Sequence, residues 1–290
     1  MGIRIKLFSA LAAMLALAVA HGATAQTTLT GLIHHWPADG TPDDAAGTAD
    51  GTMHDSVAFG TGVFGQAFQF AGGHVTLGSG TANFGTSDFT ISMWVWTQMS
   101  VETALMSKRE NCVNVPMIDI RKQPAGTVTV EFQGVSNDYT AFATTSAIAD
   151  GAWHHLAWSR VGTLQQGYID GNFAGAASGP APIEFANNAQ LMLGRSPCTG
   201  GPDGTQPFVG FLDDIQIYNR ALTSAEICEL AGEVLCPADI AHNCHVDVDD
   251  LLAVINAWGP CSRCVADITS NGQVDVDDLL AVINAWGNCA

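Results

Sequence analysis

Apolar and polar residues alternate with a period of two through much of the chain between residues 30 and 220. Asp150-Gly151 and Asp170-Gly171, two typical turn pairs, separate or flank the alternating segments. Strict alternation indicates strands with one buried face, so the pattern predicts a mainly β body of two packed antiparallel sheets. The clearest windows are Phe89–Val95, Thr127–Phe132, Trp153–Trp158 and Phe211–Tyr218.

Helical patterns appear only after residue 218. Residues 219–227 predict a short helix, with Thr223 as its N-cap and Glu226 three residues later. Near the C-terminus, an apolar stripe at helical spacing needs a partner, so we expect it to pack against a second copy. Its members are Leu279, Val282, Ile283 and Trp286.

An exact internal repeat supplies that copy. The string VDVDDLLAVINAWG occupies residues 246–259 and again residues 274–287, offset by 28 residues, and each copy follows a Cys and an Ala-Asp-Ile. The repeats are rich in Asp, whereas the preceding segment is rich in Gly and alternating strands. We therefore divide the chain into a body (residues 27–232) and a tail (residues 236–290).

The first 25 residues have the pattern of a secretory signal peptide. Arg4 and Lys6 precede an apolar run at residues 7–20, and Ala23-Thr24-Ala25 forms a small-residue cleavage site. A membrane anchor is the alternative, but it needs about 20 apolar residues. We expect a secreted or cell-surface protein, and its eight cysteines are then expected in disulfides.

Composition narrows the classes of partner. Hydrophobic residues make up 47% of the chain, which excludes a disordered protein, and no later segment is apolar enough to span a membrane. The formal charge of −18, from 28 acidic and 10 basic residues, argues against nucleic acid as a partner.

The body resembles the laminin-G-like jelly-roll domains of the concanavalin A-like lectin/glucanase superfamily. The resemblance covers residues 30–232, and implies a jelly-roll β-sandwich that binds a glycan or glycoprotein without chemistry, often with a calcium ion at its rim. Asp44, Asp213 and Asp214 are the rim-calcium candidates, with ordinary turn carboxylates as the alternative. The segments that carry the resemblance are Leu32–Gly40 with Asp43-Asp44, Gly65–Phe70, Phe89–Val95, Trp153–Ala157, Tyr168–Gly171 and Gly210–Leu222.

No catalytic residues are predicted. A glycosidase of this superfamily would carry Glu-x-Asp on one strand, and no Glu here has an Asp two residues later. A polysaccharide-degrading hydrolase or its accessory subunit, and a structural adhesion protein, remain the alternatives. Trp94 and Trp96 are expected as core or inter-sheet filler in preference to a sugar-stacking platform. The adjacent His154 and His155 point to opposite faces of a strand and do not suggest a metal site.

Each repeat of the tail contains a loop with EF-hand-like calcium spacing. In the second loop, oxygen ligands occupy positions 1, 3, 5, 9 and 12, a backbone carbonyl serves position 7, and Gly272 stands at position 6. The first loop is weaker, because Ala241 replaces the position-3 ligand and Cys244 replaces the glycine. The second set is Asp267, Thr269, Asn271, Gln273, Asp275 and Asp278; the weaker set is Asp239, Asn243, His245, Asp247 and Asp250. Zinc is an alternative for the six Cys and His residues Cys236, His242, Cys244, His245, Cys261 and Cys264, but export favours disulfides.

The tail resembles the type I dockerin domain over residues 239–259 and 267–287. That resemblance implies calcium-stabilised repeats that dock to a cohesin-like scaffold module. The recognition positions 10 and 11 depart from the usual small or hydroxyl residues, being Val248 and Asp249 in one repeat and Val276 and Asp277 in the other. A purely structural, calcium-stabilised cap is the alternative.

Four disulfides are expected. Cys112 and Cys198 are the only cysteines deep inside the jelly roll and are predicted to pair. Antiparallel packing of the repeats would bring the end of the second helix beside the first loop, so we expect Cys236 to pair with Cys289. The remaining cysteines are assigned as Cys228–Cys244 and Cys261–Cys264.

Overall fold

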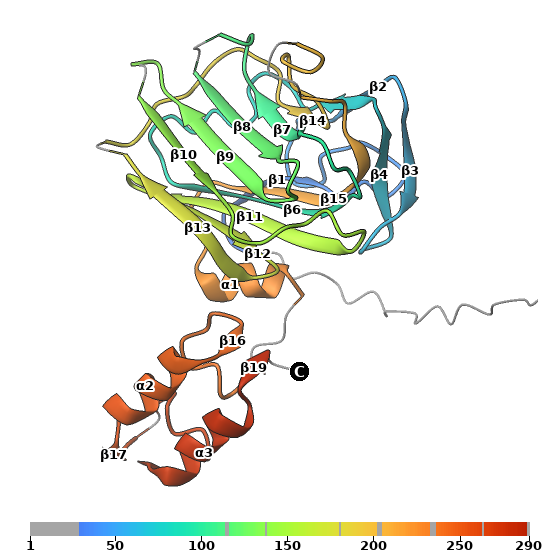
Figure 1. Ribbon diagram of the computed structural model, residues 1–290. Coiled ribbons are helices and arrows are strands. Elements are labelled where there is room, and N and C mark those ends of the chain that lie inside the picture. Colours follow the sequence, from blue (N-terminus) through green and yellow to red (C-terminus); the bar gives the residue numbers. More distant parts are fainter. Residues whose placement is uncertain are drawn as a thin grey trace, which may run out of the picture.

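A computed structural model describes residues 29–113, 116–136, 138–179, 181–201, 205–232, 236–262 and 264–288. The expected signal peptide and Cys289 lie outside these ranges. The body is a sandwich of two antiparallel sheets, here called sheet A and sheet B (Figure 1). Sheet A runs β13 (Asn172–Ser178), β12 (Leu164–Ile169), β11 (Trp153–Val161), β6 (Phe89–Trp96), β15 (Val209–Tyr218), β4 (Gln66–Ala71) and β3 (Val57–Thr61), with β1 (Leu32–Trp36) also pairing with β15. Sheet B runs β10 (Tyr139–Ala143), β9 (Val128–Gln133), β8 (Met117–Lys122), β7 (Thr103–Lys108), β14 (Met192–Leu193), β5 (His74–Thr76) and β2 (Thr52–His54).

One hydrophobic core fills the space between the sheets. Ile91, Met93 and Val95 of β6 are fully buried in it, as are Ile118 and Ile120 of β8. Each such side chain contributes about 1.5–3 kcal/mol of transfer free energy. The predicted mainly β sandwich is therefore confirmed, and alternate residues on each strand are left facing outward.

Helix α1 (Ser224–Leu230) covers part of the outer face of sheet A. Thr223 is its N-cap and forms a capping box with Glu226, as the sequence predicts. Ile227 and Leu230 are buried against a cluster that includes Tyr218. The helix thus covers one end of the outer face of sheet A and is the last element of the body.

The tail consists of two interleaved loop-helix repeats. The helices are α2 (Val248–Asn256) and α3 (Val276–Asn284). The residues that follow each helix pair with the loop of the other repeat: β16 (His245–Val246) pairs with β19 (Gly287–Asn288), and β17 (Gly259–Pro260) with β18 (Gln273–Val274). This cross-pairing is the antiparallel arrangement expected from the duplication.

The stripe that packs between the repeats differs from the predicted one. Val282 is fully buried, whereas Ile283 and Trp286 are 48% and 54% exposed. Helix α3 has apolar residues on two sides, so the sequence pattern alone does not decide which side is buried. The carboxylate of Asp278 is buried in the loop and accepts from the Asp275 N–H. Val282 lies one turn later on the same side of the helix and therefore faces inward. The second apolar side is left on the surface.

Candidate functional site

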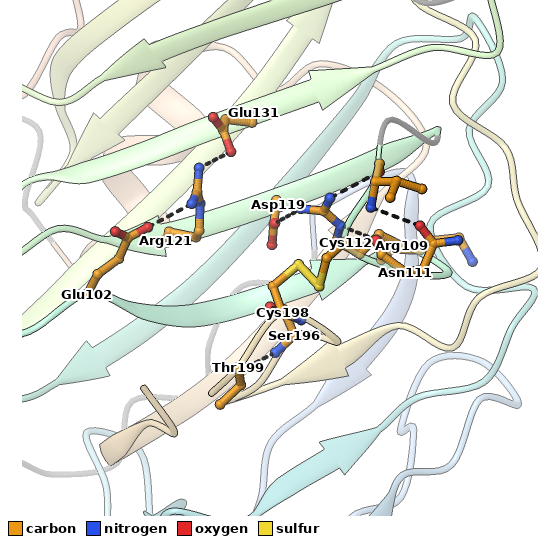
Figure 2. A network of polar contacts seen from close by, with 12 residues as sticks. Glu102, Arg109, Asn111, Cys112, Asp119, Arg121, Glu131, Ser196, Cys198 and Thr199 are labelled. Carbon is orange, nitrogen blue, oxygen red and sulfur yellow. Dashed lines mark hydrogen bonds and ion pairs between the residues drawn. A yellow bond between two sulfur atoms is a disulfide. The ribbon is translucent and has the colours of Figure 1, made fainter. Parts of the chain in front are cut away.

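A charged network lies on the outer face of sheet B. Arg121 projects from β8 between two carboxylates, donating to Glu102 Oε1 at 2.7 Å and to Glu131 of β9 (Figure 2). Burial alone would lower the pKa of Arg121, but the neighbouring carboxylates, Glu131 first, hold it above its ordinary value. The guanidinium therefore stays charged and is shared by two acids.

Tyr139 of β10 adds an aromatic ring to this network. Its hydroxyl donates to Glu131 Oε1 at 2.7 Å, while 52% of the residue remains exposed. Burial and the bond to Glu131 raise the pKa of Tyr139 to about 12, so the phenol keeps its proton. An exposed ring beside carboxylate acceptors can stack on a sugar ring while the acids accept its hydroxyl groups.

A second ion pair lies beside the first, deeper in the face. Arg109 Nη1 donates to Asp119 Oδ2 at 2.9 Å, and Asp119 is fully buried. Its pKa is raised because burial outweighs the stabilising effect of Arg109. The Ser107 hydroxyl also acts on Asp119 and lowers its pKa, although within the described ranges neither Asp119 Oδ1 nor Ser107 Oγ has a partner at full hydrogen-bond geometry.

A disulfide holds the loops that border this pair. The structure joins Cys112, in the β7–β8 connection, to Cys198, in the segment after β14, with their Cα atoms 5.2 Å apart (Figure 2). This is the pairing that the sequence analysis expects. The bond links two segments that are far apart in the chain beside Arg109 and Asp119.

Sequence reasoning missed this network, although one signal was present. Glu131 is an outward position within the alternating window at residues 127–132, and Arg121 lies in the strand before it. Their strands form a hairpin in which Arg121 pairs with Thr129 and Asp119 pairs with Glu131. Reading the outward residues of the two strands together would have placed these charges on one face.

The tryptophans of β6 lie on the outer face of sheet A, which corrects their assignment as inter-sheet filler. Trp94 and Trp96 alternate with Ile91, Met93 and Val95, which take the inward positions. Trp96 packs edge-on against Phe211, with ring centroids 5.5 Å apart, and its indole donates to the Gly151 carbonyl at 2.6 Å. They are half-buried, so they cover the sheet more than they present a free platform. The two histidines of β11 face opposite sides of the sheet, as expected. His155 Nε2 is hydrogen-bonded to Ser92 Oγ at 2.7 Å, and His154 Nδ1 to Asp170 Oδ2 at 2.8 Å.

The three rim-calcium candidates are engaged by protein groups. Asp44 accepts from His34 and from four backbone N–H groups, so both of its oxygens are in use. Asp214 meets the ring of His35 and the amide of Gln216, and Asp213 accepts from two backbone N–H groups of the β3–β4 turn. These contacts fasten loops to the sheet, but Asp213 Oδ1 is buried without a hydrogen-bond partner in the described part of the chain, so a calcium ion at the rim stays a prediction.

The second tail loop keeps the backbone that its spacing predicts. Gly272 at position 6 has φ of +86°. Asp267 accepts from the backbone N–H groups of Asn271 and Gly272, both at 2.9 Å, and Asp278 accepts from those of Thr269 and Asp275. The ends of the loop are thus drawn together by its own carboxylates, and the oxygen-only donor set has the chemistry that calcium requires. In the described ranges no three His, Cys, Asp or Glu side chains gather closely enough to form a metal cluster.

The first loop has the same backbone with different chemistry. Cys244 takes the glycine position with φ of +71°, and the equivalent bonds run from Asn243 and Cys244 to Asp239 and from Ala241 and Asp247 to Asp250. Cys244 is bonded to Cys228 of α1, and Cys261 to Cys264, as assigned from the sequence. These bonds remove three of the four thiolates that the zinc alternative would use. Cys236 is also disulfide-bonded, but its expected partner, Cys289, lies outside the described residues.

The helices present two equal apolar faces. Val248 and Val276 are 53% and 54% exposed, and Leu252 and Leu280 are both 47% exposed. Asp249 and Asp277 are also exposed at the helix starts. The positions expected to contact a partner therefore lie on the surface in both repeats. Each apolar face consists of four residues: Val248, Leu252, Ile255 and Trp258 in the first repeat, and Val276, Leu280, Ile283 and Trp286 in the second.

Comparison with known proteins assigns the body to a protein family. The Laminin_G_3 family model, described as the concanavalin A-like lectin/glucanases superfamily, matches residues 70–228. Human neuronal pentraxin-1 is 37% identical over 89 residues, which is 29% of this chain and 21% of the pentraxin. The Danio rerio adhesion G-protein coupled receptor V1 is 23% identical over 153 residues, 51% of this chain and 2% of the receptor. The chain thus spans about a fifth of the length of the neuronal pentraxins it matches.

Solved structures share the fold at low identity. Domain 4 of AbnA, a GH43 extracellular arabinanase from Geobacillus stearothermophilus in complex with arabinotriose, gives a TM-score of 0.57 at 24% identity, over 69% of this chain and 98% of that domain. The binding domain of botulinum neurotoxin DC in complex with SialylT gives 0.55 at 14%, over 70% and 51%. The binding domain of Paraclostridial Mosquitocidal Protein 1 gives 0.58 at 18%, over 69% and 52%. No helix within the described ranges is long and apolar enough to cross a membrane.

Proposed function

The chain belongs to the concanavalin A-like lectin/glucanases superfamily, and from that premise we propose that it is a secreted, non-catalytic binding protein. Its jelly roll (residues 27–232) recognises a glycan or glycoprotein, and its dockerin-like tail (residues 236–290) docks to a partner. The observation that carries the first part is the Glu102–Arg121–Glu131 network with Tyr139 exposed beside it. The fold shared with an arabinanase domain that holds arabinotriose supports a glycan as the ligand.

A glycan array tests this role, together with an assay for reducing-end release from the same polysaccharides. We expect binding without release. Tyr139→Ala should weaken binding about tenfold or more, because it removes the ring that stacks on the sugar. Phe173→Ala is the matched control, since Phe173 is also an exposed aromatic residue (59%) but lies on the outer strand of the other sheet.

Other outcomes would assign other functions. Release of reducing ends would favour the hydrolase alternative, and binding to proteins but to no glycan would favour an adhesion protein. Loss of binding in Phe173→Ala but not in Tyr139→Ala would move the site to sheet A.

For the tail, we propose that calcium binds the second loop and that the paired apolar faces contact the partner. The ligands are Asp267, Thr269, Asn271, the Gln273 carbonyl, Asp275 and Asp278, and calcium would neutralise the three carboxylates among them. Each apolar face is about half exposed, and the formal charge of the chain is strongly negative. A cohesin-like module with an apolar contact surface is the partner that fits.

Purified cohesin modules test the docking role, with and without EDTA. We expect calcium-dependent binding that survives Leu252→Asp or Leu280→Asp alone, because either face remains, and that is lost in the double variant. A tail that binds calcium but no cohesin module would instead be the structural cap.

A further inference from the structure

Resting on the glycan-binding role proposed above, we infer that the ligand on sheet B is an uncharged, hydroxyl-rich glycan, and that glycans carrying carboxylate, sulfate or phosphate groups are rejected. Two observations lead to this ligand class: the negative charge of that face, and the engagement of the protein's lysines and arginines by its own acids and carbonyls.

Throughout the described part of the chain, each lysine and arginine is already engaged. Four arginines form ion pairs, and the remaining cations donate to backbone carbonyls from buried positions. The pairs are Arg109 with Asp119, Arg121 with Glu102 and Glu131, Arg195 with Asp55, and Arg220 with Glu226. Lys108, Lys122 and Arg160 are the buried cations. Lys108 donates to the carbonyls of Ser79 and Ala189, Lys122 to that of Met99, and Arg160 to those of Gly85, Ser87 and Ile183.

On the proposed binding face the balance of charge is negative. Three carboxylates, Glu102, Glu131 and Asp119, face two guanidinium groups. Arg121 is held between two acids, so an anionic ligand would have to displace a carboxylate or lie against one. Either arrangement places like charges within a few ångströms in a partly desolvated site.

Hydrogen-bonding capacity points the same way. Carboxylates only accept hydrogen bonds, and both Nη atoms of Arg121 already donate to Glu102 and Glu131. The Nε atom of Arg121 has no partner among the described residues, but it is buried, so the surface of this face offers mainly unused acceptors and suits a ligand that donates. A hydroxyl group donates and accepts, whereas a carboxylate or sulfate brings acceptors alone. The formal charge of −18 on the whole chain further disfavours the approach of a polyanion.

Matched glycan pairs test the inference on the unmodified protein. Polygalacturonate is compared with its fully methyl-esterified, uncharged form, and neutral oligosaccharides with their sialylated and sulfated forms. We expect the neutral member of each pair to bind, with an affinity that changes less than twofold between 50 and 500 mM NaCl, and the acidic member to bind at least tenfold more weakly. Preference for the acidic members would overturn the inference and leave glycan binding standing. Binding of neither member would instead refute the glycan-binding role.

A charge-releasing variant tests the cause. Glu102→Gln with Glu131→Gln frees the Arg121 guanidinium, so acidic glycans should gain at least tenfold in affinity, and that gain should fall at high salt. Asp43→Asn with Glu229→Gln makes the same change in net charge at exposed positions that have no part in the Glu102–Arg121–Glu131 network, and it should give no gain. An equal gain in both variants, or none in the first while its unfolding transition is unchanged, would show that the pairing of Arg121 does not set the specificity.

Discussion

The Sγ atom of Cys244 occupies the space in which a side chain on Gly171 would begin: a Cβ at Gly171 would lie 2.5 Å from it. Gly171 is in the turn between β12 and β13, and Cys244 is in the first tail loop. The disulfide from Cys244 to Cys228 therefore lies directly against the body, at a turn where φ is +75°.

Gly171→Ala should consequently be more damaging than an ordinary turn substitution. The positive φ costs about 1–2 kcal/mol, and contact with the sulfur adds about 1–3 kcal/mol. Gly162→Ala is the control, because Gly162 also has positive φ (+58°) but no atom lies within 4 Å of its added Cβ. Chemical denaturation measures both, and equal losses of unfolding free energy would contradict the contact.

Peptide mapping under non-reducing conditions checks the disulfides. We expect linked peptides for Cys112–Cys198, Cys228–Cys244 and Cys261–Cys264, as the structure joins them. Cys236 is expected with Cys289, because the residues that follow α3 return to the first loop. A peptide linking Cys264 to Cys289 would contradict the proposed arrangement.

The two calcium loops should bind unequally. Loop one lacks the position-3 side-chain oxygen, and Cys244 is committed to a disulfide with Cys228. Titration calorimetry on the full chain should show one tight calcium ion and one weak or absent one. Asp278→Ala should abolish the tight event and Asp250→Ala should leave it largely intact. Two equal tight sites would mean that the spacing of the first loop is misread here.

Asp213 should make stability fall as pH rises. Burial, with a smaller contribution from Asp214, raises the pKa of Asp213 to about 7 from an ordinary 3.8. Because the folded state holds this proton more tightly, its contribution is most favourable below pH about 4 and is lost between pH 4 and 7. Asp213→Asn should remove that loss, seen as a flatter dependence of unfolding free energy on pH. Asp43→Asn, at an exposed site, should keep the wild-type slope.

Alternation was sufficient to predict the sandwich, because strands such as β6 keep a strict inward and outward order. It failed where the order is broken. The register shifts between Asp213 and Gln216 of β15, and Asp214 adopts φ of +48°. This bulge changes which side chains share a face, and nothing in the local sequence marks it.

The candidate site was less predictable than the fold. Glu102, Arg121, Glu131 and Tyr139 come from separate strands or their approaches, and only the order of strands in sheet B brings them together. In the tail, spacing alone indicated the loops. The rotation of the helices was misjudged because α2 and α3 have apolar residues on more than one side.

The Cys228–Cys244 bond also closes a covalent ring across the junction of body and tail, with a sequence separation of 16. A single protease cut at any peptide bond between these two cysteines would leave the body and tail joined. Both fragments would migrate together on a non-reducing gel and separate only after reduction. Attachment of the tail thus does not depend on an intact backbone at its own junction.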